Sequence, residues 1–386
     1  MRFKKTKIKD LISEISMGPF GSNIKVESFV DDGIPVLNGS NLDGFVLKEN
    51  SFRYVTEEKA DALGKANAHR GDVVITHRGT LGQIVFIPDN SKYDRYVISQ
   101  SQFRVKCNEK ILPEYLVYYF HTRIGQFKLL SNASQVGVPA LARASTTFQK
   151  IEIEVPSIEY QRKIVNYLES IRKKVEINNN INENLYSQMI SIFSNARAFS
   201  SWDEHKLDDI LVFFDHMRKP LSSRQREKME RIYPYYGATS IVDYVENYIF
   251  DGTYVLISED GANVVDKNGR PLTQYTFGKF WVNNHAHVVK GAQGFSEALL
   301  LALLGTLNLQ SIVTGAAQPK INQANLRNYS TPLPDAKEAK KLSDTLDPML
   351  RLMIKNDEEN AALSEIRDAI LPQLMSGELD VSGLDF

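Results

Sequence analysis

One loop of this chain carries side chains that suit contact with nucleic acid. Residues 76–82 follow an apolar stretch and offer Arg78, Thr80 and the backbone N–H groups of two glycines. Arginine donates paired hydrogen bonds to guanine, and threonine bonds phosphate oxygens. The loop lacks the Gly-Lys-Ser/Thr ending of a P-loop, so it does not cradle a nucleotide phosphate in that way. A solvated hairpin explains the same residues equally well, so both interpretations stay open.

Other loops offer weaker signals of the same kind. Residues 18–22, Gly-Pro-Phe-Gly-Ser, form a tight loop with an apolar tip, and its glycines allow close backbone approach. Residues 219–224 place two serines between basic residues, which suits phosphates. Small polar residues occupy 131–135 and 314–318, at corresponding places before a proline. Each pattern alone is more typical of an ordinary turn or loop.

Enzymatic interpretations fail one by one. His285 and His287 lie two residues apart on an expected strand, hence on one face, but no third metal ligand is placed. There is no Gly-x-Gly-x-x-Gly, no Gly-x-Ser-x-Gly and no cysteine cluster. The absence of a catalytic set shared by both halves favours binding over catalysis.

These loops need a scaffold, and the sequence predicts mixed α/β structure for residues 1–155. Apolar runs bounded by Gly, Asn and Pro predict strands. The expected strands are 34–37, 73–76, 84–87 and 97–105. Residues 113–130 carry an apolar stripe at helical spacing and predict one helix. Residues 201–334 repeat this order with different loops, as is typical where loops carry specificity on a common frame.

The helical segments that follow the two domains repeat most closely. They align without gaps at a shift of 178 positions, so that Ile164 falls on Leu342 and Asn178 on Asn356. Apolar residues recur at alternating steps of four and three, which is a heptad seam. The first seam comprises Ile164, Leu168, Ile171, Val175, Asn178, Asn182, Leu185, Met189 and Ile192. The second comprises Leu342, Leu346, Met349, Met353, Asn356, Asn360, Leu363, Arg367 and Ile370.

The asparagines suggest how the two seams pair. An antiparallel register places Asn178 against Asn360 and Asn182 against Asn356, and it leaves Ile171 against Arg367 as the one mismatch. A buried Asn is best attested as a device that fixes register. A parallel in-register pair would also match Asn with Asn, so the pattern alone does not decide. Helices of about 35 residues would form a rod of roughly 50 Å.

Composition limits the class of protein. A chain of 386 residues is long enough for two or three domains, and its single cysteine excludes a disulfide framework. We expect no signal peptide and no membrane span, because no run of about 18 apolar residues occurs. The net charge of −1 gives no indication of nucleic-acid binding. However, residues 335–386 hold 12 acidic and 6 basic residues, so basic faces remain possible elsewhere.

Taken together, these residues resemble a known family over essentially the full chain. The matching features are residues 18–22, 151–185 with Gln161-Arg162-Lys163-Ile164, 235–241, 315–321 and the ending 370–377. The chain resembles the DNA specificity subunit of type I restriction–modification enzymes. The resemblance implies two target-recognition domains separated by two helices that pack as an antiparallel coiled coil. It also implies that each domain reads half of a split, asymmetric DNA target, and that the helices dock two adenine methyltransferase (modification) subunits, which restriction subunits join.

We therefore expect α/β (α+β) target-recognition domains in two copies, at 1–155 and 201–334, with coiled-coil helices at 156–200 and 335–386. The expected protein is a non-catalytic, cytoplasmic subunit that binds double-stranded DNA, with no metal. S-adenosylmethionine is expected in the partner modification subunit and no cofactor in this chain. A coiled-coil assembly scaffold without DNA binding is the alternative. The predicted DNA contacts are Phe20, Ser22, Asn38, Ser40, Arg78, Thr80, Lys219, Ser222, Ser223, Arg224, Tyr236, Thr239, Gln318 and Lys320.

Overall fold

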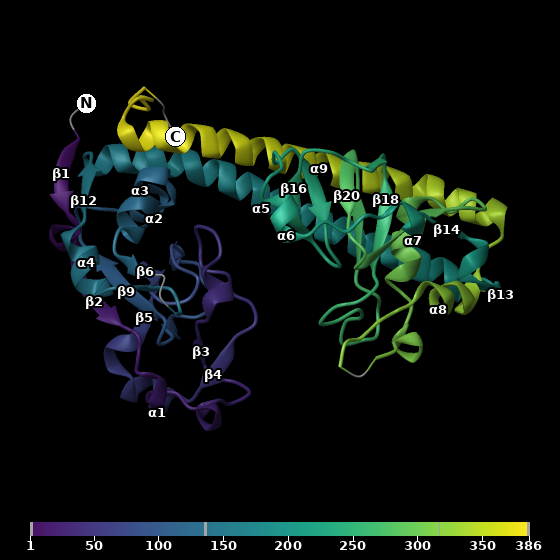
Figure 1. The fold of residues 1–386 in the computed structure, drawn as a ribbon, viewed down its shortest axis with the longest axis horizontal. Coiled ribbons are helices and arrows are strands. Elements are labelled where there is room, and N and C mark those ends of the chain that lie inside the picture. The colour runs from purple at the N-terminus through teal and green to yellow at the C-terminus, as the bar shows by residue number, and fades with distance from the viewer. Residues whose placement is uncertain (1–2, 135–136, 316, 384–386) are drawn as a thin grey trace. The chain divides into compact units, whose positions relative to one another are not determined.

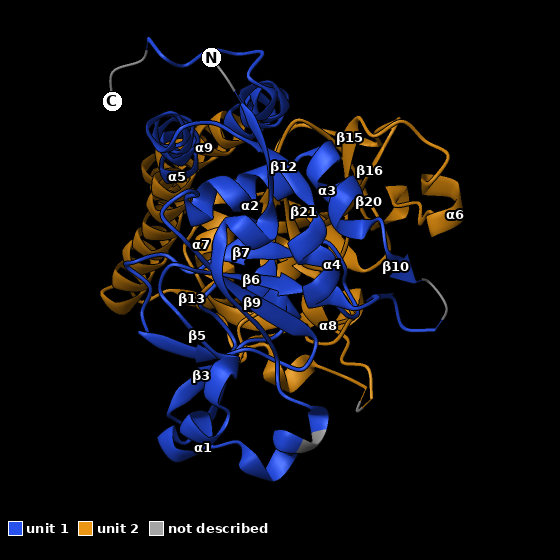
Figure 2. Ribbon diagram, turned by 90° about the vertical axis from the view of Figure 1, so that its left-hand side faces the viewer, with its two compact units in different colours: residues 1–174, 362–386 blue, residues 175–361 orange. Residues whose placement is uncertain are grey.

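The computed structural model describes residues 3–134, 137–315 and 317–383, without the side chain of Ser22. The chain forms two compact units (Figure 2), the first made of residues 1–174 and 362–386 and the second of residues 175–361. Two long helices, α5 (Ile158–Ala198) and α9 (Ala336–Ser376), each have one end in the first unit and the other end in the second. No helix in the described parts of the chain has the length and apolarity needed to cross a bilayer.

Two four-stranded sheets form the frame of the first unit (Figure 1). The larger sheet is antiparallel, in the order β2 (Ile12–Met17), β9 (Gln102–Cys107), β6 (Asp72–Thr76) and β7 (Ile84–Phe86). The second has the order β4 (Arg53–Val55), β3 (Ile34–Val36), β8 (Arg95–Val97) and β5 (Asn67–His69), with β3 and β8 parallel. The remaining elements are β1 (Lys4–Lys7), β12 (Glu152–Val155), β10 (Ala133–Ser134), β11 (Ala140–Leu141), α1 (Glu57–Ala62), α2 (Pro113–His121), α3 (Arg123–Leu130) and α4 (Ala144–Lys150).

The second unit repeats both four-stranded sheets and the two-stranded ribbon, and has the single bridge Thr314–Lys320 where the first unit has β10 and β11. Its larger sheet has the order β14 (Leu211–Phe213), β21 (Ala286–Gly291), β18 (Tyr254–Ser258) and β19 (Thr273–Thr276). Its other sheet has the order β16 (Ile241–Val245), β15 (Tyr233–Tyr236), β20 (Lys279–Val282) and β17 (Phe250–Asp251). The ribbon of β13 (Asp203–Lys206) and β22 (Ser330–Leu333) matches β1 and β12. The remaining helices are α6 (Ser223–Arg226), α7 (Glu297–Leu304) and α8 (Gln323–Asn328).

The larger sheet of the first unit lies between two apolar layers. Val74 and Val85 on one face pack with the second sheet, while Phe103 and Val105 on the other pack with the helices. This alternation follows from the two-residue period of a strand. The helix-side core also contains Leu168 of α5 and residues from the end of α9, so this end of the coiled coil is part of the core of the unit.

Two predictions from the sequence were wrong in detail. Residues 97–105 do not form one strand, because β8 ends at Val97 in one sheet and β9 begins at Gln102 in the other. Residues 113–130 do not form one helix, because the chain breaks at Thr122. The backbone of Thr122 is extended, and its hydroxyl accepts a hydrogen bond from the Gly125 N–H at 3.0 Å, so it caps a second helix. Apolar periodicity did not reveal this side-chain cap.

The long helices pack antiparallel, and their asparagines pair across the seam. In the second unit, Asn178 Nδ2 donates to Asn360 Oδ1 at 2.9 Å, and Asn356 Nδ2 donates to Asn182 Oδ1 at 2.8 Å. These are the two pairs expected from the heptad register. The mismatched Arg367 lies in the first unit, where its guanidinium stacks 5.0 Å from the centre of the Phe45 ring. It therefore contacts the recognition domain instead of filling the seam.

Candidate nucleic-acid interface

Five loops at strand ends of the first unit are linked by hydrogen bonds, and we call them the first loop cluster. They comprise residues 18–23, 38–40, 77–83, 99–102 and 137–141. The backbone N–H of Gly18 donates to the carbonyl of Gln102 at 2.8 Å, and Gln102 Nε2 donates to the carbonyl of Asn38 at 3.3 Å. The Gln83 amide donates to the carbonyl of Gly39 at 3.0 Å. Side-chain amides thus tie loops from distant parts of the chain together.

His77 is the centre of this cluster. Its N–H donates to the Ser101 carbonyl, and its own carbonyl accepts from the Leu141 N–H, both at 2.8 Å. One ring nitrogen lies 3.1 Å from the carbonyl of Gln100. Burial lowers the pKa of His77, so the ring is neutral at neutral pH and its Nε2–H donates to that carbonyl. The residue therefore acts as an anchor for three loops.

The Gly-Pro-Phe-Gly-Ser loop is shaped by close backbone approach. A Cβ added at Gly18 would lie 1.9 Å from the Ser99 carbonyl oxygen, so only glycine fits there. The loop leaves the Phe20 side chain 83% exposed. The Ser22 side chain, also a predicted contact, lies outside the described residues.

The other predicted contacts of the first domain differ in their roles. The side chains of Arg78 and Thr80 are exposed, while the backbone of Arg78 forms a bridge with Ala140. Asn38 instead accepts from the Ser40 N–H at 2.8 Å and from the Ser40 hydroxyl at 2.5 Å, while Asn38 Nδ2 donates to the Ser51 carbonyl. Asn38 and Ser40 thus shape their own turn, although Ser40 is exposed.

The second unit carries an equivalent cluster, which we call the second loop cluster. It comprises residues 214–218, 237–240, 259–263, 283–285 and 314–321, of which residue 316 is not described. Glu259 takes the place of His77: its N–H donates to the His285 carbonyl at 2.9 Å, and its carbonyl accepts from the Ile321 N–H at 2.8 Å. The two domains thus use the same backbone scheme to bring these loops together.

The side chains of the second loop cluster are ionic. Glu259 pairs with Arg218 at 2.7 Å and with Lys320 at 3.0 Å. His287 Nδ1 lies 2.6 Å from an Asp215 carboxylate oxygen, and its Nε2 lies 2.8 Å from the Ile321 carbonyl oxygen. Neutral amides bridge the first cluster and ion pairs bridge the second, so equivalent frames present different chemistry.

Asp215, Glu259 and His287 also lie close enough together for a metal site, with ligand atoms within 4.8 Å of one another. However, Arg218 contacts both carboxylates, at 2.7 Å to Glu259 and 3.5 Å to Asp215, and Lys320 takes the other oxygen of Glu259. These two cations already supply the positive charge that a metal would bring. The residues fit an ion-pair network better than a metal centre.

The predicted DNA contacts of the second domain differ in whether their side chains are exposed or bonded within the protein. Lys219, Ser223 and Arg224 are exposed, as are Thr239 and Gln318. Ser222 is exposed but caps α6, where its hydroxyl donates to Gln225 Oε1 at 2.8 Å. Lys320 is part of the ion-pair network.

Tyr236 does not fit the prediction of a direct DNA contact. Its side chain is only 8% exposed and packs edge-on against Phe280, with ring centres 5.6 Å apart. Burial raises the pKa of its hydroxyl to about 12. Tyr236 is a core residue that ends β15 and holds the following loop.

Sequence reasoning missed the residues that hold each cluster together: Gln83, Gln102 and His77 in the first, and Arg218, Glu259 and Asp215 in the second. One signal could have found two of them. His77 and Glu259 directly follow β6 and β18, which are equivalent strands of the repeat. Their side-chain types differ, so a search for identical residues passes over them.

Comparison with known proteins gives a consistent result. The family model described as type I restriction modification DNA specificity domain matches residues 4–186 and 200–365. A type I restriction enzyme specificity subunit of Methanocaldococcus jannaschii is 21% identical over 98% of this chain and 94% of that protein. A Haemophilus influenzae protein named as such a subunit is 34% identical, but the match covers only 38% of this chain and 37% of that protein.

A solved structure supports the fold. The S subunit of a type I restriction–modification system from M. genitalium aligns over 97% of this chain and 96% of that chain, with a TM-score of 0.51. The identity is 15%, so this likeness concerns the architecture alone. It agrees with two α/β domains and long helices, which is the fold class predicted from the sequence.

Proposed function

The chain belongs to the family of type I restriction–modification DNA specificity domains, and on that premise we propose that it reads a bipartite, asymmetric DNA target for such a system. Each loop cluster reads one half of the target. The chain carries no catalytic site of its own; the adenine methyltransferase activity and its S-adenosylmethionine belong to two modification subunits that the chain assembles, and restriction subunits join them.

One observation carries this proposal. The same backbone scheme gathers equivalent loops in both domains, around His77 in one and Glu259 in the other. The exposed residues on those loops differ: Phe20, Arg78 and Thr80 in the first domain, and Thr239 and Gln318 in the second, where the exposed Lys219 and Arg224 follow the loop 214–218. Two domains that recognise different DNA sequences need the same fold with different exposed side chains. Contacts to bases determine the sequence that is bound, while contacts to phosphates set the position of the domain on the DNA.

The test is a titration of DNA that contains the methylated site, with the full chain and its modification subunit, at several salt concentrations. Binding should weaken as salt rises, because Lys and Arg displace counterions from phosphates. The modification subunit without this chain should not select the site. If the full complex assembles but does not bind DNA even at low salt, the chain is an assembly scaffold and the proposal is wrong.

A further inference from the structure

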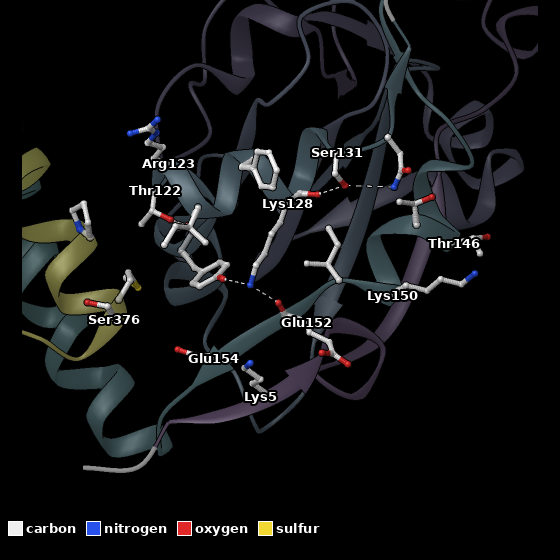
Figure 3. Close-up of a pocket in the computed structure, with 18 of the residues that line it drawn as sticks. Lys5, Thr122, Arg123, Lys128, Ser131, Thr146, Lys150, Glu152, Glu154 and Ser376 are labelled. Atoms are coloured by element: carbon white, nitrogen blue, oxygen red, sulfur yellow. Dashed lines mark hydrogen bonds between the residues drawn. The ribbon is translucent and has the colours of Figure 1, made fainter.

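The first unit has a hollow that the proposed DNA reading does not use. Its volume is about 900 Å³, and its lining comes from α3, α4, the β1–β12 ribbon and the last turns of α9 (Figure 3). Two large apolar side chains stand open beside it, Ile124 with 60% and Phe127 with 76% of their surface exposed. Pro372 and Met375 of α9 extend this apolar wall. We call this hollow the α3–α4 groove.

The segment that forms most of the groove is strongly basic. Residues 115–151 contain no Asp or Glu, and their four Lys and Arg residues all line the groove: Arg123, Lys128, Arg143 and Lys150. Lys128 is held in place, since its ammonium donates to the Tyr119 hydroxyl at 2.9 Å and to the Glu152 carbonyl at 2.6 Å (Figure 3). Glu152 and Glu154 border the groove on the β12 side.

The other three cations of this segment are available. In the described parts of the chain, Arg123, Arg143 and Lys150 form no ion pair. Two carboxylates line the groove, Glu152 and Glu154. Among the described residues they form one ion pair, between Glu152 and Lys7 at 3.9 Å. Three unpaired cations beside an apolar wall are complementary to carboxylates beside apolar side chains.

The described residues of the second unit lack the features that form the groove. The equivalent segment, residues 298–329, holds two basic residues, Lys320 and Arg327, and both form ion pairs, with Glu259 and Asp208. Between the end of α7 at Leu304 and the start of α8, the described residues form a single short 3-10 turn, Gln310–Ile312, where the first unit has the whole of α3. The groove therefore occurs on one side of an otherwise duplicated frame.

We infer that the α3–α4 groove binds an acidic segment of a modification subunit that carries large apolar side chains. The inference rests on the proposed function, and it adds the surface and its asymmetry. Phosphate contacts use charge and hydrogen bonding, so exposed Phe127 and Ile124 would contribute little to a DNA backbone. They suit a protein segment, in which apolar anchors provide the binding energy and charged rims favour the right partner. Because the groove occurs once, the two modification subunits bind with unequal affinity.

The test uses the full chain with the modification subunit of the same system, followed by native mass spectrometry and a titration of both binding steps. The wild-type chain should take up two modification subunits. Phe127→Asp should weaken one step at least 10-fold and leave the other unchanged, and Arg143→Glu should weaken the same step. Phe199→Asp is the matched control, because Phe199 is also an exposed phenylalanine, at 92%, and lies outside the groove.

Three results would overturn the inference. Both variants could bind two subunits as the wild type does; they could weaken both steps equally; or Phe127→Asp could reduce DNA affinity and leave subunit binding unchanged, which would assign the groove to DNA. Failure of the proposed function looks different, since the wild-type chain with its modification subunits would then not bind DNA even at low salt. Ile124→Asp provides a second apolar variant if Phe127→Asp does not fold.

Discussion

Asn356 Nδ2 donates a hydrogen bond to Asn182 Oδ1 at 2.8 Å, across two antiparallel helices whose seams are otherwise largely apolar. Asn182 Nδ2 in turn donates to the Met353 carbonyl and to Asp357, and the Tyr275 hydroxyl of β19 donates to the same Asp357 at 2.5 Å. One hydrogen-bonded network therefore joins the paired asparagines of the two helices to strand β19 of the second recognition domain.

This network predicts coupling between the two asparagines. Asn356→Leu should lower the free energy of unfolding by about 1–3 kcal/mol, because it leaves the Asn182 oxygen buried without its donor. The Asn182→Leu/Asn356→Leu double variant should be less destabilised than the sum of the single variants, with a coupling of roughly 0.5–3 kcal/mol. Urea unfolding of the three variants measures this. Strict additivity would mean that the pair does not act as a unit.

Gly18 predicts a loss confined to one half of the target. The Cβ of Gly18→Ala would collide with the Ser99 carbonyl at 1.9 Å, so the loop that carries Phe20 must move. We expect weaker discrimination in the first half-site and unchanged discrimination in the second, measured by binding to a panel of single-base variants. Gly39→Ala is the control, since its added carbon comes no nearer than 3.8 Å to any neighbour. Equal loss in both half-sites would refute this assignment.

Arg218 predicts the reverse pattern. Arg218→Met would leave Glu259 and Asp215 with less positive charge in a largely buried site, where the side chains of Arg218 and Glu259 are each 12% exposed. Removing one partner of such a pair costs about 3–5 kcal/mol at full burial, so we expect a loss near the lower end. The second half-site should lose discrimination and the first should keep it. A variant that unfolds with wild-type stability would show that the network contributes little.

Salt dependence can show whether Arg78 contacts a base or a phosphate of the DNA. If Arg78 bonds a base, Arg78→Ala relaxes the target at one position; if it bonds a phosphate, the variant binds all sequences more weakly, with a salt slope smaller by about one. We expect the first result, because the side chain is exposed within the first loop cluster and arginine pairs with guanine. Thr80→Ala, two residues away, is the companion variant. Unchanged affinity and unchanged specificity in Arg78→Ala would remove this residue from the interface.

The coiled coil predicts the spacing of the target. Removing one heptad from α5 and the seven residues that face it in α9 shortens the pair of helices by about 10 Å, which corresponds to roughly three base pairs. The spacer of the target should shorten while both half-site sequences stay the same. Mapping the modified sites shows the spacer directly. An unchanged spacer would mean that the helices do not set it.

The sequence predicts the frame of this protein better than its sites, and the reason is physical. Heptad spacing limits the partners of Asn178 and Asn182 to Asn356 and Asn360, and the antiparallel packing that the family resemblance implies selects between the two pairings. The break at Thr122 could not, because a single hydroxyl that caps Gly125 outweighs an apolar stripe running through both helices.

The loop clusters show a second limit. The side chains of Glu259 and His77 matter because of residues that lie far away in sequence, such as Lys320 and Gln100. Tyr236 is a predicted DNA contact within the family-like segment 235–241, yet its place at the end of β15 puts the ring in the core. Composition and spacing do not show whether a side chain at the end of a strand points to the core or to solvent.

The central claim is that two different half-sites are read by two domains of one frame. Mapping every methylated adenine in DNA modified by the reconstituted complex tests it most directly. The account predicts one motif with two unlike specific halves and a fixed spacer, and it predicts that Gly18→Ala degrades one half while Arg218→Met degrades the other. A palindromic or uninterrupted motif, or variants that degrade both halves together, would contradict it.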